Sequence, residues 1–292
     1  MAGTAIIFGA NGQDGFYLNQ LLQKKGIQVA GVSRAGNWLH TDISDYNAVK
    51  ELMKHYRPQY IFHLAANSTT SHNALFENND TIGTGTLNIL EAVKVCSPDS
   101  KVFLSGSGLQ FKNKGLPIKE TDEFDAGSPY AVSRIQSVYA ARYYRSLGIK
   151  AYAGYFFNHE SPVRPERHMS KKISAAVQRI AAGSNEKIEI GAISVKKEWA
   201  FAGDIVSAIY DLVSQDEIFE ATLGCGIAYS IEDWLEVCFS LIQKEWREYV
   251  VLKPGFIPEY EILVSDPATI RSLGWQPEVS FSMLAKMMLQ DK

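Results

Sequence analysis

The chain has 292 residues, 46% of them hydrophobic, and a formal net charge of −3 at pH 7. This length allows one large or two small domains with a buried core, and the weak charge excludes a global basic field for nucleic acid or anionic membranes. The three cysteines and six histidines show no spacing typical of a metal site, so we expect none. Three scattered thiols are typical of a reducing compartment, which predicts a cytoplasmic protein.

Short apolar segments alternate with helical patterns through the first half of the chain. The first, residues 4–10, lacks a basic flank and a cleavage site, so we interpret it as a strand and not as a signal peptide. No segment approaches the roughly 20 apolar residues of a membrane span, so no membrane association is expected. Four more strands are predicted at 27–34, 59–66, 101–107 and 150–158, with helices at 46–56, 84–96 and 130–148 and one directly after the first strand.

This alternation predicts βαβ units and therefore an α/β fold with a doubly wound parallel sheet, the Rossmann arrangement. After residue 158 the pattern becomes less regular, with helical segments separated by short strands. We expect residues 1–157 to form a dinucleotide-binding Rossmann domain. Residues 158–292 are expected to form mainly a smaller α+β substrate-binding cap, with some segments returning to the Rossmann domain.

A glycine-rich loop, GANGQDG, joins the first strand to the first helix with the spacing G-x-x-G-x-x-G. Small residues let the backbone approach a pyrophosphate, which the N–H groups of the helix N-terminus then bind. The alternative is a tight strand–helix turn with no ligand. The strand–loop–helix context favours cofactor binding by Gly9, Asn11, Gly12, Gln13, Asp14 and Gly15.

The end of the second strand predicts which dinucleotide is bound. NAD enzymes usually place Asp or Glu there, whereas this chain has Ser33 and Arg34, and an arginine can pair with a 2′-phosphate. We therefore expect NADP(H). NAD remains the alternative, with Arg34 stacking on adenine or facing water. Asp42 is expected to meet the adenine amino group, with Ile43 beside it.

The segment SPYAVSR places Tyr130 and Arg134 four residues apart, on one face of a helix start. A cation at this distance favours tyrosinate, so the phenol could exchange a proton with a substrate hydroxyl or ketone. The pair is therefore a candidate catalytic site.

These motifs together resemble the extended short-chain dehydrogenase/reductases, the NAD-dependent epimerase/dehydratase family that modifies nucleotide sugars. Within it, the chain is most similar to the GDP-mannose 4,6-dehydratases. The similarity extends along most of the chain. It is carried by GANGQDGFYLNQLL, FHLAANS, SPYAVSR, FNHESP, SKKI, KKEWAFAGDIV and SDPATIRSLGWQPEVSF.

The resemblance implies further site residues and a substrate. Leu64, Ala65 and Ala66 would lie beside the nicotinamide ribose, and Ser68 would touch the sugar. Asn158, Lys172 and Lys197 would contact the base and phosphates of a nucleotide sugar, which the resemblance implies is GDP-linked, in deoxysugar biosynthesis. The loop after Arg34, which helps subunits associate in the relatives, is shortened here, so a homodimer is expected.

The chain departs from the dehydratase pattern at four positions. Gly106 and Gly108 stand where the family has the Thr and Glu of its acid–base chemistry, and Arg134 replaces a Lys. Phe256 replaces an Arg that would bind the diphosphate, for which Lys253 or Arg164 could compensate. Glycine cannot move a proton, but Ser105 or Ser107 could supply a hydroxyl for hydride chemistry at the sugar C4.

The preferred hypothesis is therefore an NADP-dependent oxidoreductase acting on a nucleotide sugar, in the form of a 4-keto reductase with Tyr130 as proton donor. One alternative is a 4,6-dehydratase whose acid and base come from unexpected residues. A further alternative is a cofactor-binding protein with weak or no activity, and an epimerase also remains open.

Overall fold

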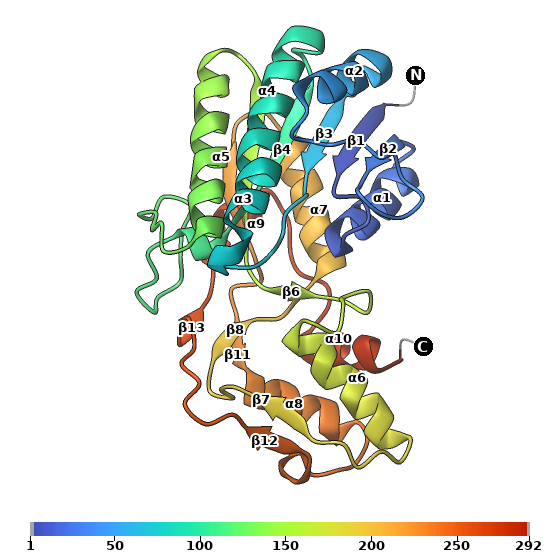
Figure 1. Ribbon diagram of the computed structural model, residues 1–292, viewed down its shortest axis with the longest axis vertical. Helices are drawn as coiled ribbons and strands as arrows, with labels where there is room; N and C mark the ends of the chain where they lie inside the picture. Colours follow the sequence, from blue (N-terminus) through green and yellow to red (C-terminus); the bar gives the residue numbers. More distant parts are fainter. Residues whose placement is uncertain (1–2, 291–292) are drawn as a thin grey trace.

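The computed structural model describes residues 3–290 and centres on a six-stranded sheet in which every strand pair is parallel (Figure 1). The strand order is β10-β5-β4-β3-β1-β2. The strands are β1 (Thr4–Phe8), β2 (Gln28–Val32), β3 (Tyr60–His63), β4 (Lys101–Ser107), β5 (Lys150–Phe156) and β10 (Glu220–Leu223). The predicted α/β class and doubly wound parallel sheet are confirmed.

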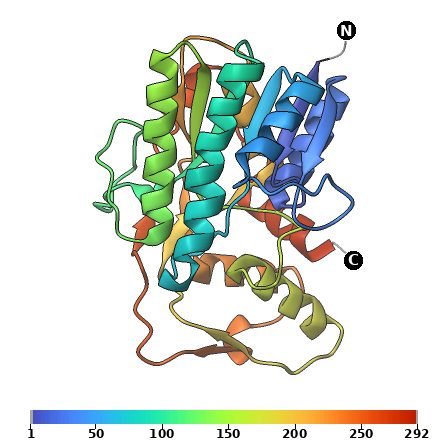
Figure 2. The ribbon, with the colours of Figure 1, turned by 45° about the horizontal axis from the view of Figure 1, so that its top comes forward.

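Helices cover both faces of this sheet (Figures 1 and 2). One face carries α1 (Gln13–Lys24), α7 (Ala202–Val213) and α9 (Ala268–Ser272), and the other carries α2 (Tyr46–Tyr56), α4 (Gly85–Cys96) and α5 (Pro129–Ser146). Successive side chains of a strand point to opposite faces, so Ile7 packs in one core and Ile6 in the other. Burial on both faces explains why the strands are continuously apolar in sequence.

The later part of the chain forms a second cluster of elements around its own core, below the sheet in Figure 1. Trp199 and Trp234 stack at its centre, with ring centroids 4.5 Å apart. Its elements are α6 (Met169–Ala181), β7 (Ile188–Ile190), β8 (Lys196–Glu198), β11 (Ala228–Ser230), α8 (Ile231–Ser240), β12 (Val250–Leu252), β13 (Ile262–Leu263) and α10 (Phe281–Gln290). A two-stranded ladder of β6 (His159–Glu160) and β9 (Ala200–Phe201) lies between this cap and the sheet.

Because β10 pairs with β5, the chain returns from the cap to the edge of the central sheet. The division at residues 157 and 158 stays a prediction. Strands expected to reach residues 66 and 158 end at His63 and Phe156, where the chain turns out of the sheet. Short turns that the sequence pattern did not predict are η1 (His72–Ala74), α3 (Leu75–Asn78), the π-helical η2 (Asn79–Thr84), η3 (Gly108–Gln110) and η4 (Trp246–Glu248).

Within residues 3–290, no helix is both long and apolar enough to cross a membrane. In that same part of the chain, no three or more His, Cys, Asp or Glu side chains gather in a way that could hold a metal ion. Cys96, Cys225 and Cys238 are all free thiols.

Candidate active site

A cavity of about 1330 Å³ opens at the carboxyl ends of the sheet strands and extends to the cap. The strand order reverses between β1 and β3, and doubly wound sheets bind their ligands at such a switch point. The cavity exceeds the ~1,000 Å³ typical of a site for one drug-sized ligand, so it has room for a dinucleotide and a second ligand.

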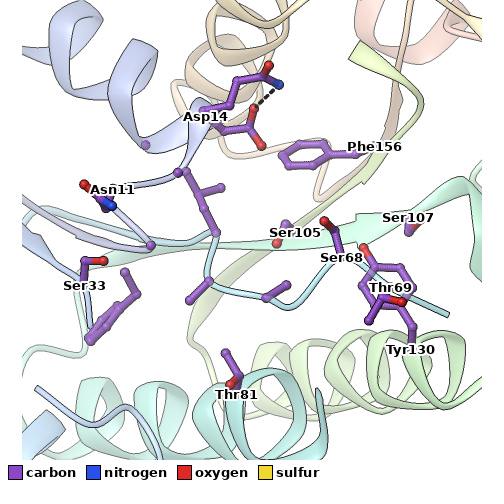
Figure 3. Close-up of a pocket in the computed structure, with 18 of the residues that line it drawn as sticks. Asn11, Asp14, Ser33, Ser68, Thr69, Thr81, Ser105, Ser107, Tyr130 and Phe156 are labelled. Carbon is purple, nitrogen blue, oxygen red and sulfur yellow. Dashed lines mark hydrogen bonds between the residues drawn. The ribbon is translucent and has the colours of Figure 1, made fainter. Parts of the chain in front are cut away.

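Nearly all of the residues selected from the sequence line this cavity. They are Gly9, Asn11, Gly12, Gln13, Asp14, Gly15, Ser33, Arg34, Asp42, Ile43, Leu64, Ala65, Ala66, Ser68, Ser105, Ser107, Tyr130, Arg134 and Asn158. Figure 3 shows Asn11 and Ser33 at one end, and Ser68, Thr69, Ser107 and Tyr130 gathered at the other. The binding roles of these residues remain predictions, but the fold brings them around one cavity.

The glycine loop has the close backbone contacts that a dinucleotide cradle needs. Gly9 has a φ of +90°, and a Cβ there would lie 2.7 Å from the Ala65 backbone nitrogen. A Cβ on Gly15 would lie 2.4 Å from the Gly9 carbonyl oxygen. Gly12 is the N-cap of α1 and has no side chain to accept from the first-turn N–H groups, which suits an anion.

A buried ion pair joins this loop to the FNHESP segment. His159 Nε2 lies 2.8 Å from Asp14 Oδ1, and His159 Nδ1 lies 2.7 Å from the Phe157 carbonyl oxygen. A carboxylate and a carbonyl only accept, so both ring nitrogens donate and the imidazole is cationic. Burial opposes this charge, but Asp14 outweighs it and raises the pKa of His159. Burial likewise works to raise the pKa of Asp14, yet His159 lowers it overall.

Gln13 reinforces the same connection. Its amide nitrogen donates to the His159 carbonyl oxygen at 3.3 Å and to Asp14 Oδ1 at 3.4 Å. Its amide oxygen accepts a hydrogen bond of 2.7 Å from the Ser161 hydroxyl. The loop and the start of the cap segment are therefore held as one unit.

At the other end of the cavity, the Arg34 guanidinium is paired with a carboxylate. Its Nη2 lies 2.8 Å from Glu77 Oε1, and Asn67 donates to Glu77 Oε2 at 2.7 Å. None of the roles expected for Arg34 included this partner, because Glu77 lies 43 residues away on α3. Asp42 Oδ1 accepts from the backbone nitrogen and hydroxyl of Ser44, and the backbone hydrogen bond is the main cause that lowers the pKa of Asp42.

The tyrosine helix begins at an N-cap, Ser128, whose hydroxyl accepts from the Ala131 backbone nitrogen at 3.1 Å. Tyr130 and Arg134 are both buried, and the guanidinium carbon lies 5.1 Å from the phenol ring centroid. Arg134 Nη1 donates to the hydroxyl of Ser105 at 2.7 Å and also to its carbonyl oxygen. The cation is thus fixed between the ring and β4.

The structure separates the two serines proposed as hydroxyl donors. The Ser105 hydroxyl accepts from Arg134 and donates to the His63 carbonyl oxygen at 2.8 Å, so its proton is already used. The Ser107 hydroxyl accepts from the Leu109 backbone nitrogen at 3.2 Å and keeps a proton to donate. Ser107 is therefore the better donor of the two.

His63, whose carbonyl oxygen accepts from Ser105, has a buried imidazole. Burial, followed by the Arg134 charge, lowers the pKa of His63 to about 3, so His63 is neutral at pH 7.

Other side chains fill the space beside the two glycines. A Cβ on Gly106 would lie 2.7 Å from Tyr155 Cδ1 and 3.0 Å from Gln110 Oε1. A Cβ on Gly108 would lie 2.8 Å from Phe157 Cε1. Tyr155 is anchored, because its hydroxyl donates to Glu220 Oε2 at 2.6 Å. Larger residues at either glycine would require these neighbours to move.

The substrate residues inferred from the resemblance divide into two groups. Asn158 and Ser68 line the cavity, and the buried Asn158 Oδ1 has no hydrogen-bond partner among the described residues. Lys172 and Lys197 are outside the lining: Lys172 donates to the Glu189 carbonyl oxygen, and Lys197 lies 3.4 Å from the buried Glu160 carboxylate. The structure therefore does not bring these two lysines to the cavity.

Two cations on the cap side line the cavity instead. Arg164 was one of the two proposed replacements for the arginine lost at position 256, and it lines the cavity, whereas Phe256 and Lys253 do not. Arg167 and His168 lie beside it, and neither was singled out from the sequence. The sequence feature that could have indicated Arg164, Arg167 and His168 together is the run of basic residues that follows FNHESP.

Solved structures that contain a bound dinucleotide share this fold. The UDP-glucose 4-epimerase of Thermus thermophilus, solved with NAD, superposes with a TM-score of 0.84 at 20% identity, over 99% of this chain and 98% of that one. RMD from Pseudomonas aeruginosa, solved with NADPH, gives a TM-score of 0.86 at 21% identity, over 100% and 97%. These similarities show the fold, a Rossmann sheet with a smaller cap.

Sequence relatives are more specific. GDP-mannose 4,6 dehydratase 2 of Arabidopsis thaliana is 32% identical over 322 residues, which cover 98% of this chain and 86% of the relative. The human GDP-mannose 4,6 dehydratase is 28% identical over 98% of this chain and 90% of its own length. The family model described as GDP-mannose 4,6 dehydratase matches residues 6–288. The chain therefore belongs to the GDP-mannose 4,6-dehydratase family of enzymes.

Proposed function

We propose that this protein binds NADP(H) and a GDP-linked hexose in the one cavity and carries out hydride chemistry at C4 of the sugar. The observation that carries the proposal is the continuity of the site: the glycine loop and the buried Tyr130–Arg134 pair line the same cavity. The cradle at Gly9 and Gly15 fits a dinucleotide, which supplies or accepts the hydride when bound.

The chain's own residues handle the proton and the substrate. Tyr130 exchanges a proton with the oxygen at C4, and Ser107 donates a hydrogen bond to the same oxygen. Arg134 stays protonated and fixes the charge beside the phenol. Asn158 has an amide oxygen free to accept from the base, and Arg164 and Arg167 provide cations for the diphosphate.

The comparisons favour a 4,6-dehydratase over the reductase that the sequence pattern suggested, since the curated relatives described above carry that name. Dehydration needs a proton removed at one carbon and delivered at another oxygen. With glycine at positions 106 and 108, another group must do this. Glu259, a cavity-lining carboxylate from the cap, is the candidate we propose.

One observation favours the reductase as the second candidate. The space beside Gly106 and Gly108 is filled by Tyr155, Gln110 and Phe157. Packed side chains therefore occupy the positions where the family pattern has acid–base groups. Reduction of a 4-keto sugar needs a hydride, which a bound NADPH would supply, together with a proton donor and a hydroxyl donor, for which Tyr130 and Ser107 line the cavity.

Two parallel assays of the purified protein distinguish these functions. GDP-mannose with NADP⁺ is followed by mass spectrometry for the loss of one water, and GDP-4-keto-6-deoxymannose with NADPH is followed by absorbance. Water loss supports the dehydratase, and Glu259→Gln should then abolish it. NADPH consumption in the second assay, without water loss in the first, supports the reductase. Cofactor binding with neither reaction would overturn both and favour a non-catalytic binding protein.

A further inference from the structure

The ion pair between Arg34 and Glu77 lies where the cofactor's adenosine end is expected. Both residues line the cavity beside Ser33 and Asp42, but Arg34 follows β2 whereas Glu77 belongs to α3. Asn67 holds the second carboxylate oxygen at 2.7 Å, so both oxygens of Glu77 are engaged. Arg34, followed by Asn67, lowers the pKa of Glu77, which is therefore an anion at neutral pH.

This carboxylate competes with a 2′-phosphate for the same guanidinium. Arg34 was expected to bind that phosphate, but its Nη2 already donates to Glu77 at 2.8 Å. Asp42 is a second carboxylate that lines the same cavity. A 2′-phosphate would bring more negative charge to a cation that already has a carboxylate partner, whereas a ribose 2′-hydroxyl brings none and can donate to a carboxylate.

The pair is nevertheless open to displacement. The side chains of Arg34 and Glu77 are 74% and 39% exposed, and exposed ion pairs contribute little stability. Arginine also has five N–H donors, so it can bind a phosphate while Glu77 stays nearby. The expected result is a weakened preference for the phosphate and not its exclusion.

We propose that Glu77 is a dinucleotide-specificity residue: by competing for Arg34, it lowers the affinity for the 2′-phosphate of NADP(H) and so allows NAD(H) to bind comparably. This inference rests on the proposed dinucleotide site. Glu77 is not part of any motif singled out from the sequence. Its proposed effect is on the binding of the 2′-phosphate and not on the chemistry at C4.

Fluorescence titration of NADPH and NADH against the wild type and Glu77→Gln tests the proposal. Glutamine keeps an oxygen for Asn67 but removes the charge. The Kd for NADPH should fall roughly 3- to 10-fold at low salt, the Kd for NADH should change less than about twofold, and the gain should shrink at high salt. Glu51→Gln is the matched control, because Glu51 forms an exposed ion pair with Lys54 on α2.

Arg34→Ala completes the test. That substitution should weaken NADPH more than NADH, and adding Glu77→Gln to it should give no further gain in NADPH affinity. An unchanged NADPH-to-NADH ratio in Glu77→Gln would overturn the inference and leave the dinucleotide site standing. A wild-type protein that binds neither dinucleotide would overturn the proposed function together with it.

Discussion

Tyr130 depends on neighbours that hold its cation in place. Arg134 cannot act as the relay that a lysine offers, since it does not release its proton, but Ser105 fixes it beside the phenol. Tyr130→Phe should lower turnover about 10²–10⁴-fold and leave the Kd for NADPH within about twofold, as measured by steady-state kinetics and fluorescence titration. Tyr139→Phe, on the exposed side of the same helix, is the control. Full activity in Tyr130→Phe would remove the catalytic assignment.

Gly106 is a packing residue as well as a departure from the family pattern. An added methyl would lie 2.7 Å from the ring of Tyr155, which is fully buried and tied to Glu220. We expect Gly106→Ala to reduce the free energy of unfolding by about 1–3 kcal/mol, measured by urea denaturation. Gly127→Ala is the control, because its nearest atom would be 3.9 Å away. Equal stability of the two variants would mean that Tyr155 moves freely.

Local spacing predicted the lining residues of the glycine loop and the tyrosine helix, because both motifs are short and lie at strand–helix junctions. It could not predict which hydroxyl of Ser105 and Ser107 is free, since that depends on Arg134 and His63 from other elements. It also could not place Lys172 and Lys197, whose side chains turn to Glu189 and Glu160. A lysine in a sequence motif has no fixed direction until its neighbours pack.

At the scale of elements, the longer strands were predictable because each is a short continuous apolar run, and the longer helices because their apolar residues recur with a helical period. The helix at 46–56 and the strand at 101–107 have the predicted bounds. The short α3 and the π-helical η2 were not predictable, because four to six residues carry too few apolar positions to show a period. Glu77, on α3, was missed for the same reason.

The contact between α1 and β6 should be sensitive to pH. His159 has a raised pKa, so its contribution to stability is fully present below its ordinary value of 6.5 and is lost as the pH rises through the higher folded-state value. Asp14 has a lowered pKa, so its contribution is present above its ordinary 3.8 and is lost on acidification. Their joint contribution is therefore complete between these two values.

His159→Gln tests this linkage by urea denaturation at pH 6 and pH 9. The variant should be less stable than the wild type by roughly 1–3 kcal/mol at pH 6, and the difference should narrow at pH 9. His72→Gln, at an exposed position, should show no such trend. A difference independent of pH would indicate that His159 acts by packing and hydrogen bonding alone.

At the scale of the whole molecule, the cap and the sheet form one ligand site because the chain passes between them repeatedly. Segments after residue 158 supply β10 and α7 to the Rossmann part, while Arg164 and Glu259 reach the cavity from the cap. In the sequence, only the irregular pattern after residue 158 indicated that later segments return to the Rossmann part. The register of β10 with β5 is a long-range pairing that no local period encodes.

The outer face of α4 and α5 is the surface where we predict a homodimer. These helices lie side by side in Figure 2, and exposed apolar residues follow one face of α5 at helical spacing: Val132, Tyr139, Tyr143 and Leu147, between 45% and 61% exposed. Leu87 and Val95 are exposed apolar residues on the neighbouring α4. An exposed apolar face of this kind suits a two-fold dimer, in which it would pack against its own copy.

Light scattering on a sizing column should give twice the mass of one chain for the wild type. The double substitution Tyr139→Glu and Tyr143→Glu should give a monomer, because it would bury charges in an apolar interface without partners. Val251→Glu, at another exposed apolar position on the cap strand β12, should remain a dimer. If the double variant still elutes as a dimer, the subunits meet elsewhere, and a dimer lost with Val251→Glu would place the interface on the cap.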